Sequence, residues 1–201
     1  MVATARERSS AEETRSRIMD VAEEHFRRVG YAKTAVADIA AALGMSPANV
    51  YRFFASKAAI NDAICRRLFD EAHALVDEII ARPAPAPERL AEVIRALHAY
   101  NRSRLTDERR LHDMVEAAMA ESWDAIESHC STVQARFADL VRAGIAERAF
   151  DPALEPEEAG RIVFDLCLGL FHPTLIAQCA SSANRIEADR VIAYVLRALR
   201  P

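Results

Sequence analysis

The sequence contains few residues that interrupt helices, and it lacks the pattern of a strand-rich protein. Only five of its 201 residues are glycine, and alanine, leucine, arginine and glutamate are abundant, a composition that favours helices. No segment alternates apolar and polar residues as a half-buried strand would. Hydrophobic residues make up 51% of the chain and charged residues 28%, which argues against global disorder. We therefore predict an all-α fold with a sizeable core.

The sequence also lacks the cysteine spacing of metal and redox motifs. Its four cysteines, Cys65, Cys130, Cys167 and Cys179, form no C-x-x-C pair and lie in apolar stretches. We interpret them as reduced, buried thiols, with a redox sensor as the alternative. Because the sequence has no signal-peptide pattern and no apolar run of membrane-spanning length, we expect a cytoplasmic protein.

The usual signatures of catalysis are missing as well. We find no glycine-rich phosphate loop, no nucleophile elbow and no convincing pair of carboxylates. His112 and Glu116 share one helix face, but two ligands are too few for a metal site. We therefore expect neither an enzyme nor a bound metal or cofactor.

The formal net charge of −4 is unevenly distributed. Residues 1–60 carry nine Arg and Lys against seven Asp and Glu, whereas residues 61–201 carry seventeen against twenty-three. A positive balance near the N-terminus is compatible with contact to phosphates, although the asymmetry is mild.

The most informative segment is Thr34–Lys57. Apolar residues at helical spacing over 36–43 predict a short helix, and Gly44 follows where a turn needs positive φ. Ser46 and Pro47 then mark a helix start, with a hydroxyl N-cap and a proline at the first helical position. Two short helices joined by a tight turn indicate a helix-turn-helix, whose second helix enters the DNA major groove.

The remaining periodic segments complete a helical chain. A helix is expected from Ser10, within a capping box, to Val29, after a flexible arm at residues 1–9. In this arm Arg6 and Arg8 either reach a DNA groove or belong to a disordered tail. Further helices are expected at 56–81, 88–105, 106–120, 122–147, 157–177 with a kink at Pro173, and 185–199.

These elements suggest a division of the chain into four parts. The Pro-rich residues 82–87 are the clearest linker, because proline interrupts helices. We expect the flexible arm, a helix-turn-helix domain at 10–55, a connecting helix at 56–81 and a helical domain at 82–201.

Five short motifs near the N-terminus resemble the TetR family of bacterial transcriptional regulators. They are Gly30-Tyr31, Val36-Ala-Asp-Ile-Ala40, Gly44-Met-Ser46, Tyr51-Arg-Phe53-Phe54 and Ser56-Lys57, at the spacing of that family. The resemblance covers residues 10–60, and the all-helical remainder has a compatible length.

The resemblance implies that the exposed residues of the recognition helix, residues 47–54, contact DNA. The matching positions are Pro47, Ala48, Asn49, Tyr51 and Arg52. Asn49 is suited to adenine, Arg52 to guanine or phosphate, and Tyr51 to the sugar-phosphate backbone.

Two residues outside the recognition helix are expected at the DNA backbone. Lys57 would contact phosphate at the start of the fourth helix, and Thr34 would cap the second helix and touch phosphate. The chain departs from the family at Ala35, where many members have a hydroxyl, and at Phe53, where histidine is frequent.

The resemblance further implies that the C-terminal domain binds a small-molecule effector and forms a homodimer. Polar or aromatic residues within apolar stretches are the effector candidates, each with a structural role as the alternative: His98, Trp123, His129, Phe164 and His172. The expected dimer interface, in the last two long helices, includes Ile162, Leu168, Phe171, Leu175, Val195 and Leu199.

We therefore expect a ligand-responsive regulator that represses transcription by binding a palindromic operator in double-stranded DNA as a homodimer. A small molecule would release it from the operator. An activator is a variant of this hypothesis. A helical enzyme or a protein–protein adaptor with an appended DNA-binding head is the alternative.

Overall fold

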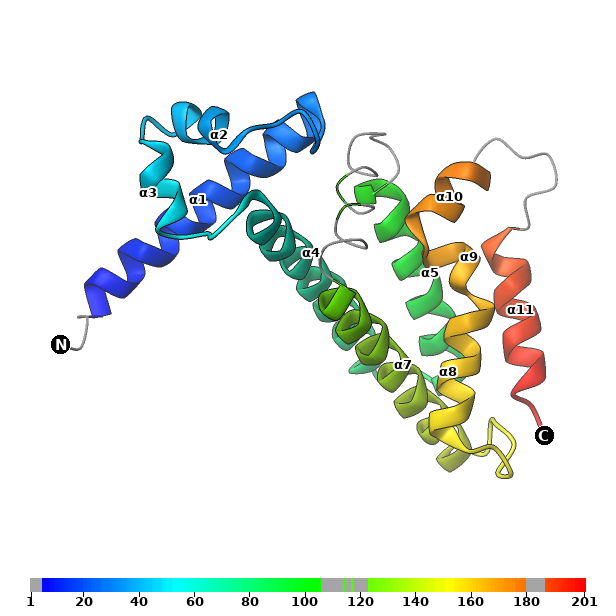
Figure 1. The fold of residues 1–201 in the computed structure, drawn as a ribbon. Coiled ribbons are helices and arrows are strands. Elements are labelled where there is room, and N and C mark those ends of the chain that lie inside the picture. Colours follow the sequence, from blue (N-terminus) through cyan, green and yellow to red (C-terminus); the bar gives the residue numbers. More distant parts are fainter. Residues whose placement is uncertain (1–4, 106–113, 115–116, 118–122, 180–186) are drawn as a thin grey trace. The chain divides into compact units, whose positions relative to one another are not determined.

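The computed structural model describes residues 5–105, 114, 117, 123–179 and 187–201. All regular structure in these residues is helical (Figure 1), which confirms the predicted all-α fold. The helices are α1 (Ala5–Val29), α2 (Val36–Ala42), α3 (Pro47–Tyr51), α4 (Lys57–Ile80), α5 (Ala86–Leu105), α7 (Trp123–Ala146), α8 (Pro156–Leu166), α9 (Leu168–Phe171), α10 (Pro173–Cys179) and α11 (Ala188–Ala198).

The chain divides into two compact units. The first comprises residues 1–68 and 108–125, and the second comprises residues 69–107 and 126–201. The division falls inside α4, not at the Pro-rich residues 82–87. Residues 82–85 form the turn before α5, in which Arg82 pairs with Glu78 of α4 and with Glu92 of α5.

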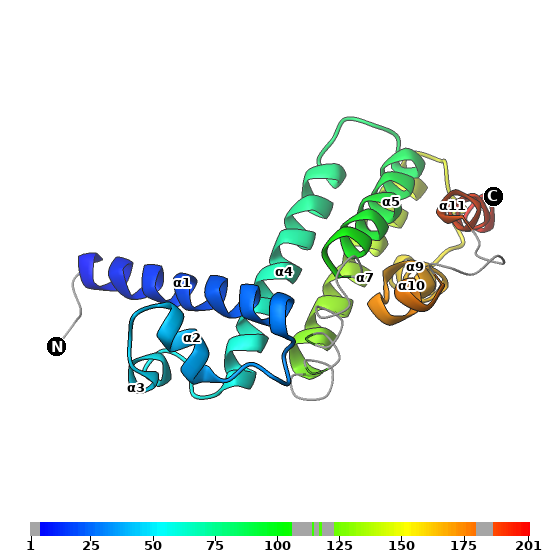
Figure 2. The same cartoon turned by 90° about the horizontal axis from the view of Figure 1, so that it is seen from above.

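In the first unit, α2 and α3 pack beside α1 (Figure 2). Ile18 and Phe26 of α1, Ile39 of α2 and Val50 of α3 are fully buried. The helix α1 begins at Ala5, so the flexible arm predicted for residues 1–9 is helical from that residue. The capping box at Ser10 is therefore internal to α1, where Ser10 offers its carbonyl to the Thr14 hydroxyl at 2.8 Å.

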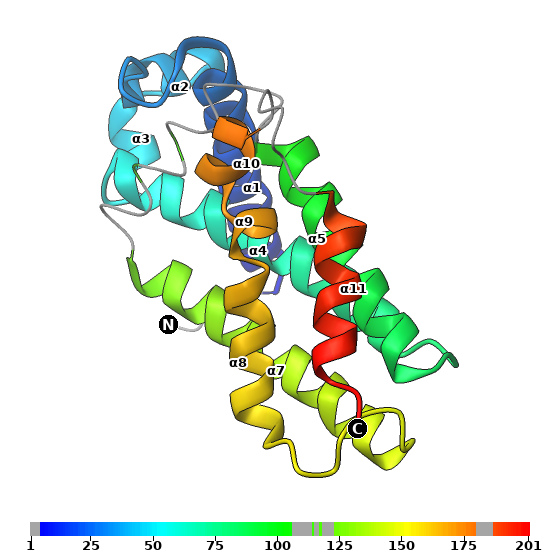
Figure 3. The same ribbon diagram turned by 90° about the vertical axis from the view of Figure 1, so that its right-hand side faces the viewer.

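The second unit contains α5, α8, α9, α10 and α11, together with half of α4 and most of α7 (Figure 3). Its core joins Leu90 and Ile94 of α5 to Phe137 of α7 and Val163 of α8. The helices α7 and α8 pack closely at Gly160 of α8, where an added Cβ would lie 2.6 Å from the backbone nitrogen of Ala138 in α7.

Residues 157–177 are predicted as one helix with a kink at Pro173; the interruption at Pro173 is observed, but the prediction of one continuous helix is wrong. This segment is divided into α8, α9 and α10, with Cys167 between the first two and an extended His172 before Pro173. The break at His172 follows from proline, which disfavours helical conformation in the residue before it. The last helix begins at Ala188, and the predicted helix at 106–120 lies almost entirely outside the described residues.

Gly160→Ala is expected to lower the free energy of unfolding by about 1–3 kcal/mol, because the new methyl group meets helix backbone that must move. Gly169→Ala is the matched control, since a Cβ there has nothing within 4 Å. Urea unfolding at equal protein concentration measures both changes. Equal stability of the two variants would contradict the tight contact between α7 and α8.

Candidate nucleic-acid interface

The helix α3 begins as the sequence predicted. Ser46 is its N-cap, and the Ser46 hydroxyl accepts a hydrogen bond from the backbone N–H of Asn49 at 3.3 Å. Pro47 occupies the first turn, where its missing N–H costs nothing. The helix is shorter than predicted, because it ends at Tyr51 and not at Phe54.

The turn before α3 is a Schellman motif. Gly44 has φ +67°, and its N–H donates to the Ala41 carbonyl at 3.0 Å. The N–H of Met45 reaches the Ala40 carbonyl at 2.9 Å, which closes the end of α2. The expected role of Gly44 is thus confirmed.

The far end of α3 is held by α1. The Arg15 guanidinium lies 4.0 Å from the centre of the Phe54 ring, and its Nη1 donates to the Phe53 carbonyl at 2.8 Å. Phe54 is buried and Phe53 half-buried, so both pack within the unit.

These contacts leave one face of α3 exposed. Pro47, Ala48, Tyr51 and Arg52 are exposed, and 52% of Tyr51 is accessible. Asn49 is half-buried, with its amide nitrogen 3.8 Å from the Met45 sulfur. The face therefore combines a ring, a guanidinium and an amide, groups that suit base edges and phosphates.

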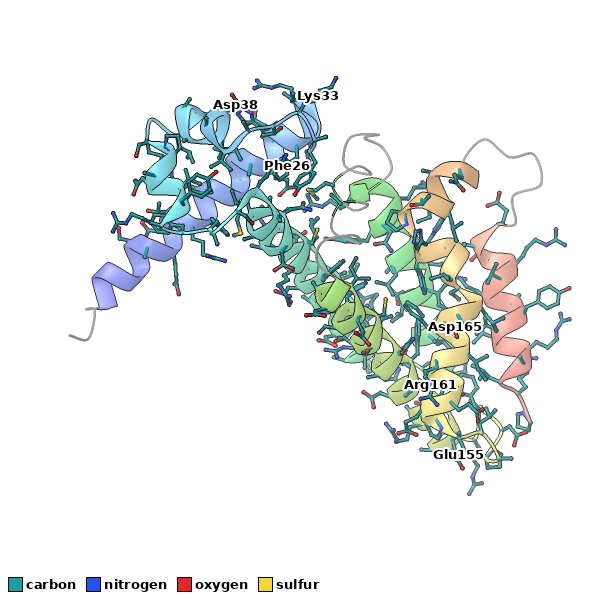
Figure 4. The ribbon with its side chains drawn as sticks, in the orientation of Figure 1. Phe26, Lys33, Asp38, Glu155, Arg161 and Asp165 are labelled. Carbon is teal, nitrogen blue, oxygen red and sulfur yellow. The ribbon has the colours of Figure 1, made fainter. Side chains whose placement is uncertain are left out.

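Thr34 is placed differently from its prediction. The N-cap of α2 is Ala35, whose N–H donates to the Asp38 carboxylate at 2.9 Å. Thr34 is buried, and its hydroxyl donates to the Gly30 carbonyl at 2.9 Å. Thr34 thus neither caps α2 nor presents its hydroxyl to a phosphate. Figure 4 shows Lys33 and Asp38 at this part of the surface.

Lys57, predicted at a DNA phosphate, contacts carbonyls of its own chain. Its ammonium donates to the carbonyls of Tyr31 at 2.8 Å and Thr34 at 3.0 Å, and it lies 4.4 Å from the centre of the Tyr31 ring. A third carbonyl, that of Ala32, lies at 3.4 Å. Because this ammonium faces protein carbonyls, Lys57 supports the turn between α1 and α2, and its phosphate contact stays a prediction.

Lys57→Ala is expected to lower the free energy of unfolding by about 1–3 kcal/mol, because several carbonyls lose a charged donor. Lys33→Ala is the control, since Lys33 is the other lysine of the chain and is exposed. Urea unfolding tests both variants. If Lys57→Ala leaves stability unchanged but weakens the salt dependence of DNA binding, Lys57 contacts phosphate and does not support the turn.

In the second unit, α5 bonds to carbonyls at the interrupted helix. Nδ1 of His98 lies 2.9 Å from the Leu170 carbonyl and must donate, because a carbonyl only accepts. The amide of Asn101 donates to the Phe171 carbonyl at 2.9 Å. Both acceptors lie just before the extended His172, where the helical hydrogen-bond ladder is interrupted. The sequence did not identify Asn101, because its role depends on this break.

The other effector candidates have different surroundings. Phe164 is buried, with its ring centre 5.9 Å from that of Phe171, and His172 is half-buried. Trp123 begins α7, but its side chain lies outside the described part of the structure. A shallow groove of about 650 Å³ at the turn between α4 and α5 is lined by none of the five candidates.

His129 of α7 forms a ring cluster with two residues of α4. Its ring stacks on Phe69 with centres 4.2 Å apart, and its Nδ1 lies 3.0 Å from Nε2 of His73. Burial, and then His73, lower the pKa of His129 from 6.5 to about 4. Burial, and then Arg136, lower the pKa of His73. One ring donates and the other accepts, so the cluster suits two neutral imidazoles.

Stability is expected to fall as the pH drops from 6.5 towards 4. In this range unfolded His129 binds a proton that the folded state excludes, and about 3 kcal/mol is lost before the effect levels off. His129→Phe should reduce this slope. Phe69→Leu, the control, should lower stability at every pH and keep the slope. Urea unfolding across this range measures the effect, and an unchanged slope in His129→Phe would contradict the assignment.

Only part of the predicted dimer interface is exposed. Ile162 is 50% exposed and Leu168 40%, whereas Leu175 is half-buried. Phe171, Val195 and Leu199 are buried in the core of their own unit, so they offer little surface to a second copy. Two exposed apolar residues on the same helices were not predicted at the interface: Leu166 is 58% exposed and Tyr194 is 68% exposed. Their spacing from Ile162 and Arg190, four residues in each case, was an available signal.

The described cysteines are poorly suited to redox sensing. Burial raises the pKa of Cys65 and of Cys167 to about 12, and it raises the pKa of the half-buried Cys130. Such thiols carry little thiolate, the reactive form, at neutral pH. The side chain of Cys179 lies outside the described residues.

The described residues form neither a membrane-spanning helix nor a cluster of metal ligands. None of the helices in this part of the chain has the length and apolar character needed to cross a membrane. Within the same residues no three His, Cys, Asp or Glu side chains gather as a metal site would require.

Two family models match this chain, one near its N-terminus and one over its C-terminal half. Residues 18–64 match the family model described as bacterial regulatory proteins, tetR family. Residues 86–192 match the model described as tetracyclin repressor-like, C-terminal domain. No curated protein matches the chain.

Solved structures share the fold at low sequence identity. A transcriptional regulator from Cytophaga hutchinsonii has 19% identity and a TM-score of 0.71, covering 92% of this chain and 97% of its own. NemR from E. coli, in its reduced form, has 15% identity and a TM-score of 0.70, with coverage of 92% and 97%. SmeT, the repressor of the Stenotrophomonas maltophilia multidrug efflux pump SmeDEF, has 19% identity and a TM-score of 0.67, with coverage of 92% and 89%.

Proposed function

The chain belongs to the TetR family of bacterial regulatory proteins, and on this premise we propose that it is a homodimeric repressor released from its operator by a small molecule. As a member of this family it is a DNA-binding transcriptional regulator and not an enzyme. The operator is palindromic, because a two-fold dimer presents the same reading surface twice.

The exposed face of α3 is the observation that carries the proposal. Tyr51 and Arg52 project from a short helix whose other face is buried through Val50. In the proposed complex Arg52 binds guanine or phosphate, Tyr51 contacts the backbone and Asn49 reads a base edge. Pro47 and Ala48, also exposed, lie at the end of α3 that enters the groove first.

Exposed apolar residues of the second unit support the dimer. Ile162, Leu166 and Tyr194 are each at least half exposed on α8 and α11, although the residue that follows each of them is buried in the core. Large exposed apolar side chains gathered on neighbouring helices are typical of protein interfaces. A second copy of the chain would cover them.

The interrupted helix supports an effector site in the second unit. His98 and Asn101 hold carbonyls of α9 through two hydrogen bonds, so a ligand that competes for these donors would move α9. We place the effector beside α9, near Phe164 and His172. Its binding shifts the population towards a conformation with low DNA affinity. SmeT is a repressor, and repression by this chain is proposed by analogy.

Selection of bound duplexes from a random library, using the purified chain, tests this function. We expect a palindromic consensus whose half-site centres lie about one helical turn, roughly 34 Å, apart. A stable dimer that enriches no sequence even at low salt would contradict the proposal and favour a protein–protein adaptor.

Arg52→Ala is expected to weaken binding to the selected duplex by about 5- to 150-fold, because a contact to a base or phosphate is lost. Arg200→Ala removes an equal charge from an exposed residue at the other end of the chain and serves as the control. Fluorescence anisotropy at fixed salt measures both affinities. Equal affinities would contradict the role of Arg52.

A further inference from the structure

The exposed face of α8 carries a stripe in which two acids flank an apolar residue. Glu158, Ile162 and Asp165 follow one another at spacings of four and three residues, and all three are exposed. Helical geometry aligns such residues on one face, with the two carboxylates about 10 Å apart along the axis. Figure 4 shows Asp165 on α8. We call these three residues the acidic stripe.

The exposed face of α11 carries the same pattern with the opposite charge. Arg190, Tyr194 and Arg197 repeat the spacings of four and three residues, and all three are exposed. The Arg197 guanidinium lies 5.4 Å from the centre of the Tyr194 ring, which orders the pair. We call these three residues the basic stripe.

The charged groups of the two stripes differ from neighbouring charges in how they are paired. Among the described residues, none of the two acids and two arginines makes an ion pair. By contrast, neighbouring charges do: Glu157 pairs with Arg142 and Asp189 with Arg95, both at 2.6 Å. The stripes lie opposite the residues of their own helices that enter the core, such as Val163 and Val195. They therefore point away from their own subunit.

From these matching patterns we propose that the acidic stripe of one subunit binds the basic stripe of a second copy of this chain. The inference rests on the proposed homodimer and specifies the surface that forms it. A two-fold axis makes the contact twice, giving four charge pairs around two contacts between Ile162 and Tyr194. Equal spacing lets the carboxylates meet the guanidinium groups whether the two helices run parallel or antiparallel.

The stripes also select the partner. Arg161 is exposed beside the acidic stripe, but it lies towards the side of α8 that carries Glu157, outside the stripe. The acidic stripe repels an acidic surface and the basic stripe repels a basic one, because like charges brought together repel. A related chain without this pattern would therefore pair poorly with this one.

Charge reversal in separate chains tests the contact. Glu158→Arg/Asp165→Arg makes both stripes basic, and Arg190→Glu/Arg197→Glu makes both acidic. Each variant is expected to weaken its own dimer by about 30-fold or more in sedimentation velocity at low salt. An equimolar mixture of the two should form heterodimers, and a chain with all four changes should regain the homodimer.

The control variant Glu24→Arg/Glu127→Arg changes the net charge as much as the first variant, but at exposed residues outside both stripes. It should dimerise like the unaltered chain. Circular dichroism confirms that each variant is folded. If a reversed variant does not fold, the neutral Glu158→Gln/Asp165→Asn replaces it, and its dimer affinity should no longer fall with added salt.

Two results would overturn the inference, and a third would overturn the dimer itself. Reversed variants that dimerise like the unaltered chain would exclude the stripes from the interface. A mixture that stays monomeric although both variants fold would exclude contact between the stripes of two chains. If the unaltered chain stays monomeric at all concentrations, the proposed homodimer fails as well.

Discussion

A helix of five residues, such as α3, is not stable by itself in water. It therefore depends on contacts with the rest of the first unit. Three contacts keep α3 in place: the Ser46 cap at its start, the buried Val50 in its middle and the Arg15 hydrogen bond to Phe53 just after its end. Each satisfies backbone groups or buries apolar surface that an isolated helix would expose. Because the helix is ordered before it meets DNA, less conformational entropy is lost on binding.

Further contacts hold the start of α4 to α1 and to the turn that follows α1. Lys57 ties the start of α4 to the turn between α1 and α2, and Arg67 pairs with Asp20 and Glu23 of α1 at 2.6 Å. The first unit is thus stabilised at both ends of the α4 segment that it contains. Since α4 continues without interruption into the second unit, it is the element through which we propose that effector binding alters DNA affinity.

Local sequence signals predicted local structure well. Gly44 and Ser46-Pro47 determine their own conformations, so the turn and the start of α3 were readable from the chain. Thr34 was misassigned because its hydroxyl suits a cap, whereas its burial depends on distant residues. The break at Cys167 has no glycine or proline to mark it. An apolar residue such as Val195 suits a core and an interface equally. Only the packed structure shows that Val195 is buried and Tyr194 is exposed.

In the proposed complex, two copies of the chain present two α3 helices to one operator. Hydroxyl-radical footprinting of a selected duplex, with the protein-to-DNA stoichiometry measured on the same complex, tests it most directly. A dimer on a palindromic operator should give two chains per duplex and two protected regions related by two-fold symmetry, with centres about 34 Å apart. One chain per duplex, or a single protected region without symmetry, would contradict it.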